Sequence, residues 1–140
     1  MEKLYICLLD FLFIIYFSNS SVAEQIEVRS CNVDSTSQRV FVLITRENLE
    51  DMNFLKSVIH EIQAKFSSFE KLKISFYDDE ENCGYKIEVL GDDPETSIIK
   101  NNDVKNHYLG DYDSEFRILK IFKPGNCFIV EREILLDPKK

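Results

Sequence analysis

The segment from Val40 to Tyr77 constrains the fold more than any other part of this chain, because its pattern predicts a strand, a long helix and a second strand. Residues 40–45 form an unbroken β-branched and aromatic run, which is typical of a strand buried on both faces. Residues 71–76 alternate polar and apolar side chains, as a half-buried strand does. Between them, apolar residues recur at steps of three and four and predict one face of a helix: Met52, Leu55, Ile59, Ile62, Phe66 and Phe69.

This helix is predicted to run from about Leu49 to Ser68. Asn48 is a favourable N-cap, and Glu50 and Asp51 place negative charge at the positive end of the helix dipole. A helix of that length spans roughly 30 Å, which is longer than any one strand that it covers. We therefore expect it to cross a sheet of several strands.

Further strands are predicted on both sides of this unit, over residues 25–31, 85–90, 107–112, 116–122 and 127–136. A turn is predicted at Asp113–Ser114, and the sequence Lys123-Pro124-Gly125-Asn126 suits a type II turn. The predicted fold class is therefore α+β, with one long helix packed on a mostly antiparallel sheet in the order β-β-α-β-β-β-β-β.

The first 23 residues have the layout of a secretory signal peptide. Residues 4–17 are apolar except Asp10, and Ser21-Val22-Ala23 places small residues at the two positions that signal peptidase reads. An uncleaved anchor is the alternative, but a helix over residues 4–17 reaches only about 21 Å, whereas the hydrocarbon core is about 30 Å thick. We expect residues 1–23 to be removed and residues 24–140 to form a single secreted or periplasmic domain, with no stable membrane insertion after cleavage.

Composition indicates one globular domain and limits its partners. The 140 residues are 44% hydrophobic, which is enough for a single core. The formal net charge is −8, and an acidic surface repels the phosphate backbone of nucleic acids. We therefore expect no nucleic-acid partner, and we expect a protein partner to present a basic surface.

Three cysteines remain after residue 23, namely Cys31, Cys83 and Cys127. In an oxidising compartment they predict one disulfide and one leftover thiol. If the strands at Val40 and Leu72 run parallel, Cys31 and Cys127 fall at one end of the sheet and Cys83 at the other, so a Cys31–Cys127 disulfide is predicted. No two cysteines have CxxC spacing and neither histidine is near a cysteine in sequence, so no metal site and no cofactor are predicted.

The densest charge cluster is the acidic run Asp78, Asp79, Glu80 and Glu81. Calcium binding is one interpretation, but the EF-hand pattern requires Gly and Glu where this chain has Cys83 and Val89. A solvated hairpin tip is the simpler interpretation. As such a tip, the four carboxylates are candidate binding residues for a basic partner.

His107 is the better functional candidate of the two histidines, since His60 lies toward the polar side of the predicted helix. The stretch that follows His107 has two tyrosines flanking Gly110, a residue that lets a backbone or a ligand approach closely. Within it, Asp111 is a second catalytic candidate, and Tyr108 and Tyr112 are candidate binding residues.

The alternation of Asp111, Asp113 and Glu115 resembles a metal or acid–base pair. A turn-forming role for Asp113 is the simpler explanation. The GxSxG, HExxH and P-loop signatures are all absent, so the sequence names no nucleophile and no reaction.

Two stretches carry a resemblance: Ile74-Ser75-Phe76-Tyr77-Asp78-Asp79 after the helix, and His107-Tyr108-Leu109-Gly110-Asp111-Tyr112 further on. With the helix, they resemble a group of small, mostly exported bacterial α+β domains with no assigned activity, over roughly residues 40–115. The resemblance implies no ligand and no catalytic residue. The overall plan is also similar in shape to cystatin-like proteins, but their glycine-rich hairpin motif is missing.

The sequence therefore predicts a small exported domain that binds a protein partner, of which an inhibitor or immunity-type protein with an acidic face is one form. The alternative is a small extracytoplasmic hydrolase or ligand-binding enzyme that uses His107 with Tyr108, Asp111 or Tyr112. An imidazole that lies within hydrogen-bond reach of a carboxylate or hydroxyl in a concave site would favour the enzyme.

Overall fold

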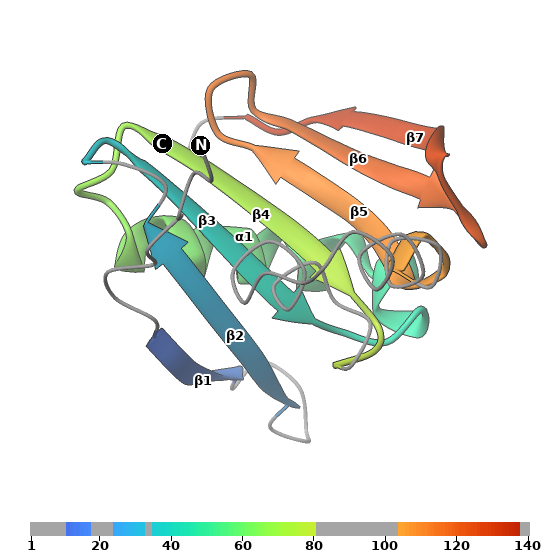
Figure 1. Ribbon diagram of the computed structural model, residues 1–140, viewed down its shortest axis with the longest axis horizontal. Coiled ribbons are helices and arrows are strands. Elements are labelled where there is room, and N and C mark those ends of the chain that lie inside the picture. Colours follow the sequence, from blue (N-terminus) through green and yellow to red (C-terminus); the bar gives the residue numbers. More distant parts are fainter. Residues whose placement is uncertain (1–10, 18–23, 33–34, 81–103, 138–140) are drawn as a thin grey trace, which may run out of the picture.

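The computed structural model describes residues 11–17, 24–32, 35–80 and 104–137 (Figure 1). In these residues one seven-stranded sheet follows the chain order from one edge to the other. Its strands are β1 (Phe11–Phe17), β2 (Glu24–Asn32), β3 (Ser37–Leu43), β4 (Lys71–Tyr77), β5 (Tyr108–Asp113), β6 (Ile118–Lys123) and β7 (Asn126–Leu135). All neighbours are antiparallel except β3 and β4, which run parallel because a helical crossover joins them.

The crossover consists of a short 3₁₀ helix, η1 (Glu47–Glu50), and the helix α1 (Met52–Lys65). Asp51 separates them because its backbone is extended, with φ −95° and ψ 91°. The Asp51 carboxylate caps α1 by accepting a hydrogen bond from the Phe54 N–H at 3.0 Å. The prediction that Asn48 caps the helix was wrong. Its side-chain oxygen instead accepts a hydrogen bond from the Thr45 N–H at 2.9 Å, and α1 starts later than Leu49.

The hydrophobic core lies between α1 and one face of the sheet, with α1 behind β3 and β4 in Figure 1. The predicted apolar stripe of the helix is confirmed, since Leu55, Ile59 and Ile62 are fully buried. Alternate residues of the strands complete the same cluster: Val40, Val42, Leu72, Ile74, Phe76, Tyr112, Leu119 and Ile121.

The predicted fold class is confirmed: the described residues form an α+β fold, with α1 packed on a mostly antiparallel sheet. Two other predictions are not tested by this fold. Strand β1 lies within the apolar stretch of the predicted signal peptide, whose removal near Ala23 stays a prediction. The strand expected over residues 85–90 lies outside the described residues. In the described parts of the chain, no helix is long and apolar enough to cross a membrane.

An aromatic row lies on the sheet face that is turned away from α1, and it crosses four strands. Phe41 stacks on Tyr77 with ring centroids 6.2 Å apart, and Tyr77 stacks on Tyr108 at 4.7 Å. The ring of Phe122 follows at 4.9 Å from Tyr108. Such pairs stabilise cross-strand packing, so this face carries a second apolar cluster.

The topology does not support the predicted Cys31–Cys127 disulfide. Cys31 pairs with Arg39 at the start of β3, whereas Cys127 follows the β6–β7 turn at the opposite end of the sheet. Four strands separate β2 from β7, so five spacings of about 4.8 Å place them roughly 24 Å apart, and a disulfide spans about 6 Å between Cα atoms. The Cys127 thiol is free. The predicted parallel pairing of β3 and β4 was correct. However, β5 lies directly beside β4, and this places Cys127 at the end of the sheet opposite to the predicted one.

Candidate functional site

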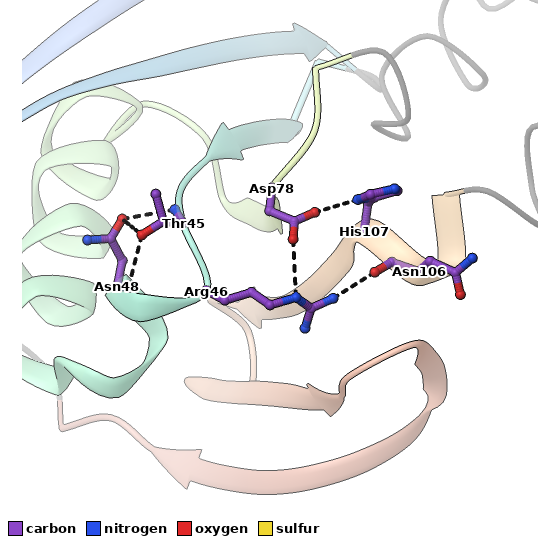
Figure 2. A network of polar contacts seen from close by, with 6 residues as sticks. All are labelled: Thr45, Arg46, Asn48, Asp78, Asn106 and His107. Atoms are coloured by element: carbon purple, nitrogen blue, oxygen red, sulfur yellow. Dashed lines mark hydrogen bonds and ion pairs between the residues drawn. The ribbon is translucent and has the colours of Figure 1, made fainter.

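A network of charged side chains lies where β3 and β4 end and β5 begins. Arg46 follows β3, Asp78 follows β4, and His107 directly precedes β5. The carboxyl ends of the parallel strands β3 and β4 meet at one edge of the sheet, and the antiparallel β5 starts at that edge. The three side chains therefore converge although the first and the last are 61 positions apart in sequence (Figure 2).

Asp78 is the centre of this network. Its Oδ1 lies 2.7 Å from Nδ1 of His107, and its Oδ2 lies 3.2 Å from Nε of Arg46. Nη2 of Arg46 also donates to the backbone carbonyl of Asn106 at 2.7 Å. The backbone N–H of Asp78 donates to the carbonyl of His107 at 3.2 Å, so the strand ends are joined twice.

This arrangement fixes the imidazole. An ionised carboxylate only accepts hydrogen bonds, so Nδ1 of His107 carries the proton in this contact and Nε2 is left as the second ring nitrogen. Among the described residues, the only side chain that hydrogen-bonds the imidazole is Asp78. The pair is therefore an oriented acid–base group, and among the described residues no hydroxyl or thiol is hydrogen-bonded to the imidazole.

A second polar group lies on the same sheet face as the aromatic row. The Tyr108 hydroxyl donates to Oδ2 of Asp111 at 3.1 Å and lies 3.2 Å from the Ser75 hydroxyl. Nζ of Lys73 lies 3.8 Å from the same carboxylate oxygen of Asp111. Burial, and then the negative charge of Asp111, raise the pKa of Tyr108 far above its usual range. Tyr108 is therefore a neutral hydrogen-bond donor held within the sheet.

The structure separates the candidate residues predicted from the sequence. His107 and Asp78 are brought together, and Tyr108 and Asp111 are brought together. Tyr112, a predicted binding residue, is only 2% exposed and belongs to the core beneath α1. The side-chain amide of Gln63 on α1 donates to its hydroxyl at 2.9 Å.

The acidic run is only partly the solvated tip that the sequence suggests. Asp78 is engaged by Arg46 and His107, and its side chain is 18% exposed. Glu80 is exposed and Asp79 is half-buried just beyond β4, and Glu81 lies outside the described residues. Among the residues that the structure describes, no cluster of three or more His, Cys, Asp or Glu side chains could hold a metal ion.

Two features were missed from the sequence. Arg46 belongs to no sequence motif, and only the parallel pairing of β3 and β4 brings it to Asp78. The other feature is β7, which ends the sheet and has no strand on its outer edge among the described residues. Large apolar side chains on this strand are exposed: Phe128, Ile129, Val130 and Leu135. The uninterrupted apolar run Cys127-Phe128-Ile129-Val130 could have indicated this surface from the sequence, because an apolar run on a strand with an exposed face is unusual.

The pairing between β6 and β7 explains this exposure. Lys123 pairs with Asn126 and Phe122 pairs with Val130, so the residues between Asn126 and Val130 have no paired partner on β6. This bulge leaves Phe128 without a partner on β6, and Phe128 is 82% exposed. The register shifts again between Ile121 and Phe122.

Comparison with known proteins gives no relative: no protein family model, no curated protein sequence and no solved structure matches this chain.

Proposed function

We propose that this chain is a small exported binding module that holds a protein partner along β7. The observation that supports this most strongly is the exposed apolar surface of an edge strand, with Phe128 82% and Leu135 64% exposed. Exposed apolar patches of this kind on a folded protein mark interaction sites. An open strand edge also presents unpaired backbone N–H and C=O groups, which an extended segment of another protein can pair with.

The charges on β7 define the partner further. Glu131 and Glu133 are exposed on this strand, and Asp137 follows it. The one cationic side chain on β7, Arg132, is turned back to η1, where Nη2 lies 3.4 Å from the Leu49 carbonyl and 3.5 Å from Oε1 of Glu50. The chain as a whole carries −8. The partner is therefore an extended segment with apolar and basic side chains, and an inhibitor or immunity-type role is one form of this function.

The experiment compares capture of a partner from the native extracellular or periplasmic fraction by the full chain and by two variants. Phe128→Ser removes the most exposed apolar side chain of β7, which has no partner on β6, so capture should be lost. Phe116→Ser is the matched control, because Phe116 is also exposed but lies in the β5–β6 turn. Capture by the wild type and by Phe116→Ser, with release at high salt, is the expected result.

Equal capture by all three proteins would contradict a role for β7, and no capture by any of them would contradict the binding function. The mass of the native chain purified from the same fraction also tests export, because removal of residues 1–23 should leave a chain that begins at Glu24.

A second candidate function is a small hydrolase centred on His107, which the 2.7 Å contact between Asp78 and His107 favours. A carboxylate on Nδ1 is the arrangement that orients a general-base histidine. The full chain should then hydrolyse a member of a panel of ester, peptide and phosphate substrates. His107→Ala should abolish that activity, whereas His60→Ala on α1 should retain it. Activity that survives His107→Ala would rule this candidate out.

A further inference from the structure

The other edge of the sheet is closed by the N-terminal segment of the chain. Strand β1 pairs with β2 in antiparallel register over seven residues, from Phe11 opposite Ser30 to Phe17 opposite Glu24. Among the described residues β1 pairs with no other strand, so it is the outermost strand at this edge (Figure 1). The outer edge of β2 therefore accepts an extended segment in this fold.

The segment that fills this edge is the same apolar stretch that predicts export. β1 has the sequence Phe-Leu-Phe-Ile-Ile-Tyr-Phe, with no charged residue. The predicted cleavage follows Ala23, and β2 begins at the next residue, Glu24. Processing at that bond would remove the whole of β1 and leave the whole of β2.

Removal of β1 leaves β2 short of partners. β2 pairs with β3 only from Val28, opposite Val42, to Asn32, opposite Gln38. Residues 24–27 pair with β1 alone. Without β1, this stretch has no neighbouring strand and the entire outer edge of β2 presents unpaired backbone groups, which are satisfied best by another strand.

We propose that the outer edge of β2 is a strand-acceptor site in the processed chain, and that it takes an extended, uncharged apolar segment of a partner protein. The partner strand runs antiparallel to β2 in the register that β1 occupies before processing. This deepens the binding function proposed above and rests on the export that it includes, but it uses the opposite edge of the sheet. The chemistry of β1 itself defines the occupant, because β1 is the segment seated there. The two edges thus differ: β7 suits a basic segment and β2 suits a neutral one.

The probe is a labelled synthetic peptide that contains Phe11–Phe17, with lysines added at both ends for solubility. It is titrated into the full chain and followed by fluorescence anisotropy. In the wild-type chain β1 fills the edge, so binding should be weak. In a full-chain variant with Phe13→Pro and Ile14→Pro together, β1 cannot pair, because neighbouring residues of a strand alternate in the direction of their N–H groups. This variant should bind the peptide at least about tenfold more tightly than the wild type.

Two controls separate this site from β7 and from nonspecific adhesion. The full chain with Phe128→Ser keeps β1 in place and should bind the peptide as weakly as the wild type. A peptide that carries the same two prolines should bind none of the proteins. Equal affinity for the wild type and the double-proline variant, or binding of the proline peptide, would overturn the proposal. Loss of partner capture by Phe128→Ser is measured separately, so failure of one edge is distinguishable from failure of the other.

A second measurement covers the case in which the double-proline variant does not fold. A full chain with a protease site introduced between residues 17 and 24 is cut after folding, so that β1 is held only by its pairing with β2. The labelled peptide should then exchange into the cut chain, and amide hydrogens of residues 24–27 should remain protected in its presence. If the cut chain releases β1 completely and the labelled peptide still does not bind to it, the proposal is overturned.

Discussion

At the scale of single residues, Gly110 illustrates a requirement that comes from a neighbouring strand. It lies between Phe76 of β4 and Ile121 of β6, and a Cβ at this position would collide with the backbone carbonyl oxygen of Lys120. The sequence suggested that Gly110 allows a backbone or a ligand to approach, and the structure shows that it is the backbone of β6.

Gly110→Ala should therefore lower the free energy of unfolding by about 3 kcal/mol, the upper end of the cost of overpacking, because a carbonyl oxygen in a sheet cannot move aside. Gly125→Ala is the control: its Cβ would meet nothing, and only its φ of 77° is unfavourable, which costs about 1 kcal/mol. Urea unfolding of both variants measures the difference. A Gly110→Ala protein that is as stable as the wild type would show that β5 and β6 are not paired as described.

Tyr108 provides a pH-dependent prediction at the same scale. Burial, followed by the charge of Asp111, raises the pKa of Tyr108 in the folded chain, whereas a tyrosine in the unfolded chain ionises near pH 10. The group therefore stabilises the fold fully below about pH 10, and this contribution is lost as the pH rises from there toward the folded pKa. The Tm of the wild type should fall more steeply between about pH 10 and 12 than that of Tyr108→Phe, and parallel curves would contradict a buried, neutral phenol.

At the scale of elements, the Asp78 carboxylate joins the ends of β3 and β4 to the start of β5. Asp78→Asn keeps the shape of the side chain but removes the charge that faces Arg46 and His107. Because Arg46 is 41% exposed, solvent screens part of this interaction, and the expected loss of stability is only about 1 kcal/mol.

The matched control is Glu115→Gln, which removes the 3.9 Å contact with Lys71 between two side chains that are more than half exposed. This variant should be as stable as the wild type. Chemical denaturation compares the two variants, and an equal effect would mean that the Asp78 network is no more than a surface ion pair.

Most of the elements themselves were predictable, because their signals are local. The helix stripe was visible as spacing, and the turn at Pro124–Gly125 was visible as residue types, with Gly125 at positive φ as a type II turn requires. Asp113 also forms its predicted turn, since its carboxylate accepts from the Glu115 N–H at 2.9 Å. The start of α1 was not predictable to the residue, because both Asn48 and Asp51 are good caps and only the extended backbone of Asp51 decides between them.

At the scale of the whole molecule, the order of strands decides the state of the cysteines. Cys31 and Cys127 lie on strands that have four other strands between them, and at opposite ends of the sheet. Cys127→Ser should therefore leave the free energy of unfolding within about 1 kcal/mol of the wild type, whereas loss of a disulfide between these positions would cost about 4–5 kcal/mol. Thermal unfolding under oxidising conditions measures this, and mass spectrometry after alkylation should show Cys127 modified. A large loss of stability would contradict the sheet order.

The sequence by itself determined the helix and its apolar face, the strands β2 to β7 and the fold class, because each depends on periodicity within about twenty residues. It did not determine β1, which lies in the stretch predicted as a signal peptide. Only the tertiary structure decided which strands are neighbours. The antiparallel pairing of β5 with β4 brings His107 to Asp78, turns Tyr112 into the core and sends Cys127 to the end away from Cys31. It also decided which edges stay open, because the exposure of β7 and the pairing of β1 with β2 depend on the position of each strand in the sheet. No local pattern specifies that position, since strand pairing joins residues far apart in the chain.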